Sequence, residues 1–383
     1  MDHVSNLPTR PMRLLSIDGG GLAGLIPAEA LIAIETQLDE ITGKSSPLCD
    51  RFDLIGGTST GAILAVGLAL GLKAAELRDF YLDFGKEIFT KVFWLERFWH
   101  NYPSAPLEQH LKEVFGKDTA VGSEKLRTSI LIVSKNVTLG TTWFFTNNPK
   151  SKYFANNRAL PLWQIVRASS AAPTYFPPQT ISVPDDNGQP QKYEFIDGGV
   201  SSYKNPSLQV FLEATEPDYH FGFPVGVDNL LLISLGTGFE SVTVPAGKAI
   251  GYNRLNWARY AIKELMNDAN LQQNVLMHIL GQPPITQAPA PVAESNAARA
   301  AGRPTDDALD FIAAGTGGFK ALTYQRVTVS FTRERLLGLN LGDIDPIKVA
   351  EMDAVDQIGN FQRIGRAVAE EQVRMEALRR FFP

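Results

Sequence analysis

The chain has 383 residues, of which 44% are hydrophobic and 20% are charged, with a formal net charge of −5 at pH 7. These values are ordinary for a globular protein, and the chain has no excess of basic residues, so we exclude nucleic-acid binding. The length allows one or two domains. Cys49 is the single cysteine and cannot form an internal disulfide, and the polar residues 1–13 contain no apolar signal segment. The longest apolar run, residues 62–72, is shorter than the ~20 residues that cross a bilayer. We therefore expect a reducing, cytoplasmic setting.

Apolar runs rich in β-branched residues alternate with amphipathic stretches of helical length along the chain. This alternation predicts an α/β fold in which helices cover both faces of a largely parallel sheet. The expected strands are residues 13–17, 52–56, 129–133, 142–146, 193–196 and 230–234. The expected helices are residues 25–40, 60–72, 74–88, 107–115, 162–168, 207–214, 257–280 and 347–378.

One change of composition interrupts this pattern. Residues 281–308 are rich in Pro and Ala and poor in large apolar side chains, so we expect an exposed or mobile loop. The alternating stretch YQRVTVSF at 324–331 then predicts a strand, and the helical pattern after it is expected to pack back on the same domain.

A glycine-rich loop follows the first predicted strand. The sequence SIDGGGLAGLIP at 16–27 contains G-x-G-x-x-G, the pattern of dinucleotide-binding loops. Such a fold places an acidic residue about 20 residues further on, whereas this chain has GGTSTG after its second predicted strand. Asp18 would also repel a pyrophosphate unless its side chain were turned away. Three glycines before a helix can instead aim several N–H groups at an oxyanion, and the remaining alternative is a tight turn with Asp18 as a helix cap.

Residues 57–61, GTSTG, form a G-x-S-x-G motif between an apolar strand and a helix of small residues. This context predicts a nucleophile elbow with Ser59 at its tip, since glycines on both sides remove side chains that would collide with the strand and the helix. The backbone N–H of the next residue would lie near a developing oxyanion.

A serine nucleophile needs a base, and none of the five histidines has a motif around it: His3, His100, His110, His220 and His278. Asp197 is better placed, because YEFIDGG at 193–199 is a short strand that ends in this residue and continues with two glycines. A carboxylate at the carboxyl end of a strand points toward the same edge as Ser59, and partial burial would raise its pKa toward that of a working base. The alternative is a turn without chemistry.

Several motifs together resemble those of the patatin-like phospholipases, a family of lipid acyl hydrolases. They are DGGG at 18–21, ASSAAPTYFPP at 168–178, SLGTG at 234–238, and the elbow and DGG motifs above. Their order and spacing agree over residues 12–238, and the segments that follow extend the likeness to plant patatin toward the C-terminus.

The resemblance implies a three-layer α/β/α sandwich with a mostly parallel central sheet, in a single catalytic domain over residues 10–383. It implies a Ser–Asp dyad with Ser59 as nucleophile and Asp197 as base, an acyl-enzyme intermediate, and neither a metal nor a cofactor. It also assigns the oxyanion hole to Gly19, Gly20 and Gly21. The family usually has Lys or Arg where this chain has Ala23, so neutral lipids and simple acyl esters stand beside phospholipids as expected substrates.

Two other functions remain open from the sequence. An α/β-hydrolase with a Ser-His-Asp triad would use a histidine such as His220 or His278, although Ser59 follows only the second predicted strand and that fold normally reaches its nucleophile later. A catalytically silent protein that binds lipid or a partner is the third possibility, but it would not need Ser59, Asp197 and the glycine loop together.

The segment FTKVFWLERFWHNY at 89–102 carries six aromatic residues interleaved with charged ones. Such a segment can lie in the headgroup region of a bilayer and admit an acyl chain, or it can be a core helix over the active site. The first interpretation predicts transient contact with a membrane surface by a cytoplasmic protein. The acidic net charge argues against strong adsorption to anionic lipid through the chain as a whole.

Overall fold

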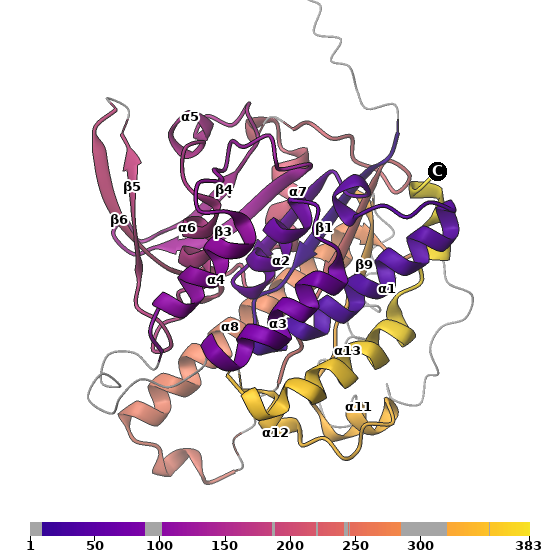
Figure 1. Ribbon diagram of the computed structural model, residues 1–383. Helices are drawn as coiled ribbons and strands as arrows, with labels where there is room; N and C mark the ends of the chain where they lie inside the picture. The colour runs from indigo at the N-terminus through magenta and orange to yellow at the C-terminus, as the bar shows by residue number, and fades with distance from the viewer. Residues whose placement is uncertain are drawn as a thin grey trace, which may run out of the picture.

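A single mixed sheet forms the centre of the computed structural model, which describes residues 10–88, 102–185, 188–219, 221–240, 244, 246–284, 320–351 and 353–383 (Figure 1). In this part of the chain the strands are β1 Met12–Ile17, β2 Leu54–Thr58, β3 Ser129–Asn136, β4 Thr141–Thr146, β5 Gln179–Pro184, β6 Pro190–Asp197, β7 Leu230–Leu235, β8 Gly281–Gln282 and β9 Leu322–Val327. The strand order is β5-β6-β3-β2-β1-β7-β9-β8, and β4 also pairs with β3. Every pair from β3 to β8 along this order is parallel. The predicted α/β class with a mostly parallel sheet is confirmed.

Helices cover both faces of the sheet (Figure 1). They are α1 Leu25–Thr42, α2 Thr60–Ala69, α3 Ala74–Ile88, α4 Ala105–Phe115, α5 Phe154–Asn157, α6 Leu162–Ser169, α7 Ser207–Thr215, α8 Arg254–Leu280, α11 Arg333–Gly338, α12 Pro346–Val349 and α13 Ile358–Gln372. Short 3₁₀ turns include η1 Gly21–Gly24 and η4 Gly198–Val200. In Figure 1, α1, α3 and α13 lie on the near side of the sheet and α8 passes on the far side.

The two faces of the sheet belong to separate cores, because successive side chains of a strand point to opposite sides. Leu15 and Ile55 face the larger core, which also contains side chains of α1, α2, α3, α4, α6 and α13. Leu14 and Leu54, one residue earlier in each strand, face the smaller core with side chains of α7 and α8. Coverage on both faces explains why β1 and β7 consist mainly of apolar residues.

The carboxyl ends of β2 and β6 meet on one edge of β3. Strand β2 runs parallel to β3 and ends where Thr58 pairs with Val133. Strand β6 runs antiparallel to β3 and ends where Asp197 pairs with Ser134, the next residue of β3. The two strands therefore approach each other head-on, and this brings the residues that follow them together. Asp197 reaches this edge at the carboxyl end of a strand, as expected, and this strand runs antiparallel to β3.

The long helix expected over residues 347–378 is also corrected by the structure. It is broken into α12, the 3₁₀ turn η7 Val355–Gln357, α13 and the 3₁₀ turn η8 Met375–Phe381. At the second break the side chain of Gln37 on α1 donates to the carbonyl of Val373 at 3.2 Å and accepts from the Met375 amide at 3.0 Å. A side chain from another helix thus takes the place of the helical hydrogen bonds.

Three further expectations meet the structure only in part. The strand expected over 324–331 is β9, which begins at Leu322 and ends at Val327. The loop expected over 281–308 begins as a strand, since Gly281 and Gln282 form β8 beside β9, and residues 285–308 lie outside the described residues. The aromatic segment lies outside them too, except for Tyr102, which is buried and stacks on Tyr175 with ring centroids 6.2 Å apart.

One helical segment of the described chain, Gly21–Thr42, is long and apolar enough by composition to cross a membrane. This segment is distinct from the apolar run at residues 62–72. Of its most apolar window, 72% is buried inside the structure, where α1 packs against α3 and α13. This burial is that of a core helix.

Candidate active site

Ser59 lies on a sharp turn between β2 and α2. Its backbone has φ 54° and ψ −122°, a conformation that residues other than glycine rarely adopt. The turn is tight: a Cβ added at Gly57 would lie 2.1 Å from the carbonyl oxygen of Gly61, and one added at Gly61 would lie 2.1 Å from that of Ile17. Glycine is therefore required on both sides of the serine, as a nucleophile elbow demands.

The structure brings Ser59 and Asp197 together. The Ser59 hydroxyl donates to Oδ2 of Asp197 at 2.6 Å, and the Gly199 amide donates to Oδ1 of the same carboxylate at 2.7 Å. The Ser59 amide donates to the Ser169 hydroxyl at 2.8 Å, and that hydroxyl donates to the Val133 carbonyl at 2.6 Å. Both groups are buried, so backbone and side-chain contacts together fix the position of each.

Burial determines the ionisation of this pair. It raises the pKa of Asp197 to about 6, against the opposing effects of the Ser59 hydroxyl, the Gly199 amide and the positive charge of Lys204. Burial also lowers the pKa of Lys204. A carboxyl group with a pKa near 6 is a stronger base than an exposed one and is still ionised at neutral pH.

The three glycines of the loop do not have equal roles. The Gly19 amide donates to the Lys204 carbonyl at 2.9 Å, so it is not a free donor, contrary to the expectation for this residue. The amides of Gly20 and Gly21 have no acceptor among the described residues, and neither does that of Thr60, which follows the nucleophile. These groups lie at the amino-terminal ends of η1 and α2, where orphan N–H groups are found.

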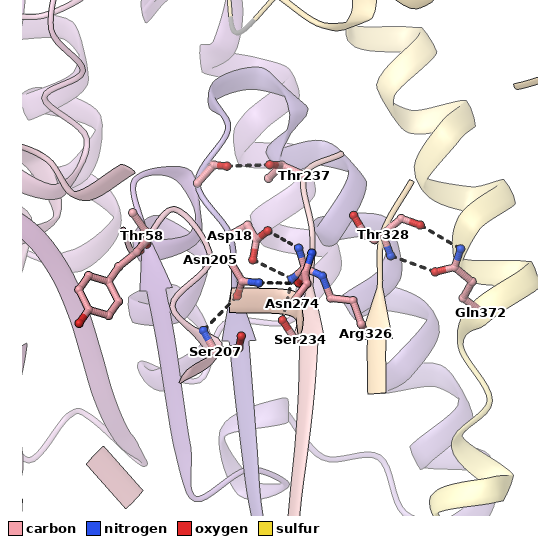
Figure 2. Close-up of polar contacts among 12 residues, drawn as sticks. Asp18, Thr58, Asn205, Ser207, Ser234, Thr237, Asn274, Arg326, Thr328 and Gln372 are labelled. Carbon is pink, nitrogen blue, oxygen red and sulfur yellow. Dashed lines mark hydrogen bonds and ion pairs between the residues drawn. The ribbon is translucent and has the colours of Figure 1, made fainter. Parts of the chain in front are cut away.

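Asp18 is turned away from Ser59, beneath the glycine loop. Its carboxylate forms a two-pronged ion pair with Arg326 of β9, with N–O distances of 2.9 and 2.5 Å, and Arg326 also donates to Ser234 at 2.6 Å (Figure 2). The side chains of Asp18 and Arg326 are only 2% and 6% exposed. The hydroxyl of Thr237 donates to the Gly19 carbonyl at 2.7 Å. Asp18 therefore neither caps a helix nor repels an anion in the loop.

An apolar cavity of about 50 Å³ opens beside Ser59. Its walls come from η1, α2, α3, α4 and the segment after α6, and include Leu22, Ile63, Ile88, Leu107, Ala172, Tyr175 and Phe176. Tyr81, also in the wall, donates to the Thr60 carbonyl at 2.9 Å. A cavity with these walls suits a hydrocarbon chain whose polar end is at Ser59.

The described histidines have other partners. His278 lies on α8, where its Nδ1 is 2.8 Å from the Asn274 carbonyl, and His110 on α4 is 3.0 Å from Glu87. His3, His100 and His220 lie outside the described residues. Within those residues, no group of three or more His, Cys, Asp and Glu side chains is placed to hold a metal ion.

Comparison with known proteins identifies the family. Residues 15–209 match the family described as patatin-like phospholipase. Patatin-15 of Solanum tuberosum is 32% identical over 273 residues, covering 67% of this chain and 69% of the relative. Patatin-like protein 2 of Arabidopsis thaliana is 32% identical over 275 residues, covering 64% of each. The chain belongs to the patatin-like phospholipase family. Among solved structures, VipD from Legionella pneumophila aligns over 93% of this patatin-like chain and 67% of the VipD chain. The TM-score is 0.31 and the sequence identity is 12%, so this likeness carries no argument.

Sequence reasoning missed three groups that support the site of this patatin-like protein. Ser169 and Thr237 lie within stretches that carried the family resemblance, but neither was assigned a role. Arg326 gave one usable signal, because it is a cation within a predicted strand and requires a partner if the strand is buried. Nothing in the local sequence indicated that this partner is Asp18.

Proposed function

We propose that this patatin-like protein is a lipid acyl hydrolase that cleaves fatty-acyl esters through a Ser59–Asp197 dyad. The observation that carries the proposal is the 2.6 Å hydrogen bond between the two side chains, at a strained elbow beside an apolar cavity. Family membership supports the general activity, since the relatives are patatins.

In the proposed reaction, Asp197 accepts the proton of the Ser59 hydroxyl while Oγ attacks the ester carbonyl carbon. The oxyanion that forms accepts hydrogen bonds from the free amides of Gly20, Gly21 and Thr60. The tetrahedral intermediate collapses, and the alcohol leaves with the proton from Asp197. Water then gives a proton to Asp197 and attacks the acyl-enzyme, and the fatty acid is released as Ser59 recovers its proton.

The substrate class follows from the cavity and the loop. The apolar walls favour an acyl chain, and Ala23 is a buried part of the larger core that offers no cation to a phosphate. We infer that recognition depends on the acyl chain, so phospholipids, neutral lipids and simple esters are all candidate substrates.

We further propose that residues 10–383 act as one catalytic domain. The late elements belong to the same layers as the early ones, because β9 pairs with β7 within the central sheet and α13 packs against α1. An active site whose loop is held by Arg326 needs this late part of the chain.

The experiment compares Ser59→Ala and Asp197→Asn with the parent on a soluble p-nitrophenyl ester and on phospholipid, lysophospholipid and triacylglycerol. Each change is expected to lower kcat by about 10³-fold or more, because each removes one member of a unit. The exposed Ser45→Ala is the matched control. A fluorophosphonate should label the parent and not Ser59→Ala. Full activity in either dyad variant would refute the dyad.

The other two functions give different results in the same assays. A His220→Asn/His278→Asn double variant should retain turnover, whereas a triad enzyme would lose it. A silent binding protein would show neither turnover nor labelling of Ser59 in the parent.

A further inference from the structure

Helix α8 is much longer than the sheet that it covers. It has 27 residues and therefore spans about 40 Å, whereas the six residues of β7 span about 20 Å. Its carboxyl end leads directly into β8, which pairs with the first residues of β9, so this end lies at the amino edge of the parallel strands. The excess length therefore projects beyond the opposite edge, where Ser59 lies. Figure 1 shows the amino-terminal part of α8 extending away from the body of the molecule.

Contacts with the DGG turn show where the projection begins. A Cβ added at Gly199 would lie 3.7 Å from Cε of Met266, so this residue of α8 is level with the site. Further along, Asn274 is anchored by Asn205, which donates to it at 2.9 Å (Figure 2). The twelve helical residues before Met266 thus extend about 18 Å past the level of the dyad.

The projecting end exposes large apolar and aromatic side chains. Ile250 is 92% exposed, Leu265 is 68% exposed and Trp257 is 45% exposed. The Trp257 ring contacts those of Tyr252 and Tyr260, with centroids 5.3 and 5.8 Å apart. We call residues 248–260 the α8 tip. Tyr and Trp rings beside exposed aliphatic groups are typical of segments that lie at a membrane–water interface.

The charge of this region is opposite in sign to that of the whole chain. Residues 244–263 include Lys248, Arg254, Arg259 and Lys263 and contain no Asp or Glu, whereas the chain carries a net charge of −5. Lys248 and Arg254 are exposed and have no acidic partner in the described chain, while Lys263 pairs with Glu240 at 2.5 Å. Unpaired cations beside aromatic groups complement a surface of anionic headgroups.

We propose that the α8 tip docks this protein onto anionic phospholipid membranes, with the edge that carries Ser59 facing the bilayer. The apolar side chains enter the interface while Lys248 and Arg254 bind headgroup phosphates and carboxylates. The proposal rests on the proposed function in one respect, since it explains how the active site would reach lipid in a membrane. Binding of the protein to the membrane does not itself require hydrolysis. It also reconciles an acidic protein with an anionic surface, because the contact is confined to one basic projection.

The test uses the full chain with Ser59→Ala, so that hydrolysis cannot alter the lipid. Co-sedimentation is measured with phosphatidylcholine vesicles, with and without phosphatidylserine. The parent should bind the anionic vesicles more tightly, and added salt should weaken this binding. Ile250→Asn/Trp257→Ala should weaken it about tenfold or more. Lys248→Gln/Arg254→Gln should do the same and should reduce the dependence on salt.

The matched control is Lys152→Gln/Tyr153→Ala. Tyr153 is a 57% exposed aromatic residue beside a lysine, just before α5. This segment follows β4, which ends at the amino edge of the sheet. This variant should bind as the parent does. Circular dichroism and thermal unfolding check that every variant is folded.

Two outcomes would overturn the docking proposal. One is unchanged binding by both tip variants, and the other is loss of binding in Trp94→Ala/Trp99→Ala alone, which would assign docking to the aromatic segment instead. Equal binding to neutral and anionic vesicles would overturn the role of the cations. If the Ser59→Ala chain binds through the tip but the wild-type chain hydrolyses none of the esters, the proposed function is refuted and the docking proposal stands.

Discussion

The surroundings of Asp197, the proposed base, shift its pKa in opposite directions. Burial raises its pKa to about 6, while Ser59, Gly199 and Lys204 stabilise the carboxylate and limit the rise. A carboxyl group shifted further would be protonated at neutral pH, and an exposed one would be a weaker base. The balance between these effects places the ionisation just below neutrality.

The pH dependence of the reaction tests this balance. In the parent, kcat/KM for a soluble ester should increase as the pH rises through about 6, because only ionised Asp197 accepts the proton. Lys204→Met removes a charge that lowers the pKa of Asp197, so this limb should move to higher pH. Lys204→Arg should restore it, and the exposed Lys192→Met should leave it in place. A limb that stays unmoved in Lys204→Met would contradict the assignment.

At the scale of single residues, sequence was most informative where chemistry requires special backbone. Ser59 and Asp197 were singled out because glycines surround them. The structure brings the two side chains together, and their catalytic roles stay a prediction. The use of the Gly19 amide could not be predicted, because its acceptor is the carbonyl of Lys204, which is distant in the sequence. The pairing of Asp18 with Arg326 was missed for the same reason.

At the scale of elements, the tight packing of the elbow makes it sensitive to substitution at its glycines. Gly61→Ala would place a methyl group 2.1 Å from the Ile17 carbonyl, so β1 and α2 must separate. We expect the free energy of unfolding to fall by about 3 kcal/mol and the activity to be largely lost. Gly359→Ala on α13, where an added Cβ meets nothing within 4 Å, is the control and should be neutral or slightly stabilising. Chemical denaturation of both variants checks this, and a fully stable, active Gly61→Ala would contradict it.

The elements show where periodicity stops being informative. Residues 74–88 were predicted with the bounds that α3 has, because the helical pattern is regular and ends are marked. The helical pattern of residues 347–378 is equally regular, yet Gln37 from α1 satisfies the backbone at Val373 and Met375 and so allows a break. Strands β5 and β8 were missed, because a short strand is determined by its partner more than by its own residues.

At the scale of the whole molecule, one buried ion pair joins distant parts of the chain. Asp18 and Arg326 are 308 residues apart in sequence and link β1 to β9 across β7. Arg326→Met should reduce the free energy of unfolding by about 3–5 kcal/mol, because it removes the hydrogen-bonded partner of a buried carboxylate. Asp18→Asn/Arg326→Met should lose less.

An exposed pair provides the comparison. Arg363→Met removes a surface partner of Asp343 and should leave the free energy of unfolding almost unchanged. Urea denaturation of the three variants measures these differences. If Arg326→Met were as stable as the parent, the ion pair would not support the glycine loop.

The position of Arg326 also has a consequence for the order of events during synthesis. Ser59 leaves the ribosome early, but the counter-charge for Asp18 is made 308 residues after it. A partly synthesised chain therefore contains Ser59, the proposed nucleophile, beside a glycine loop that still lacks the ion pair between Asp18 and Arg326. The proposed hydrolytic competence is therefore expected to arise only after the segment that carries Arg326 has been synthesised.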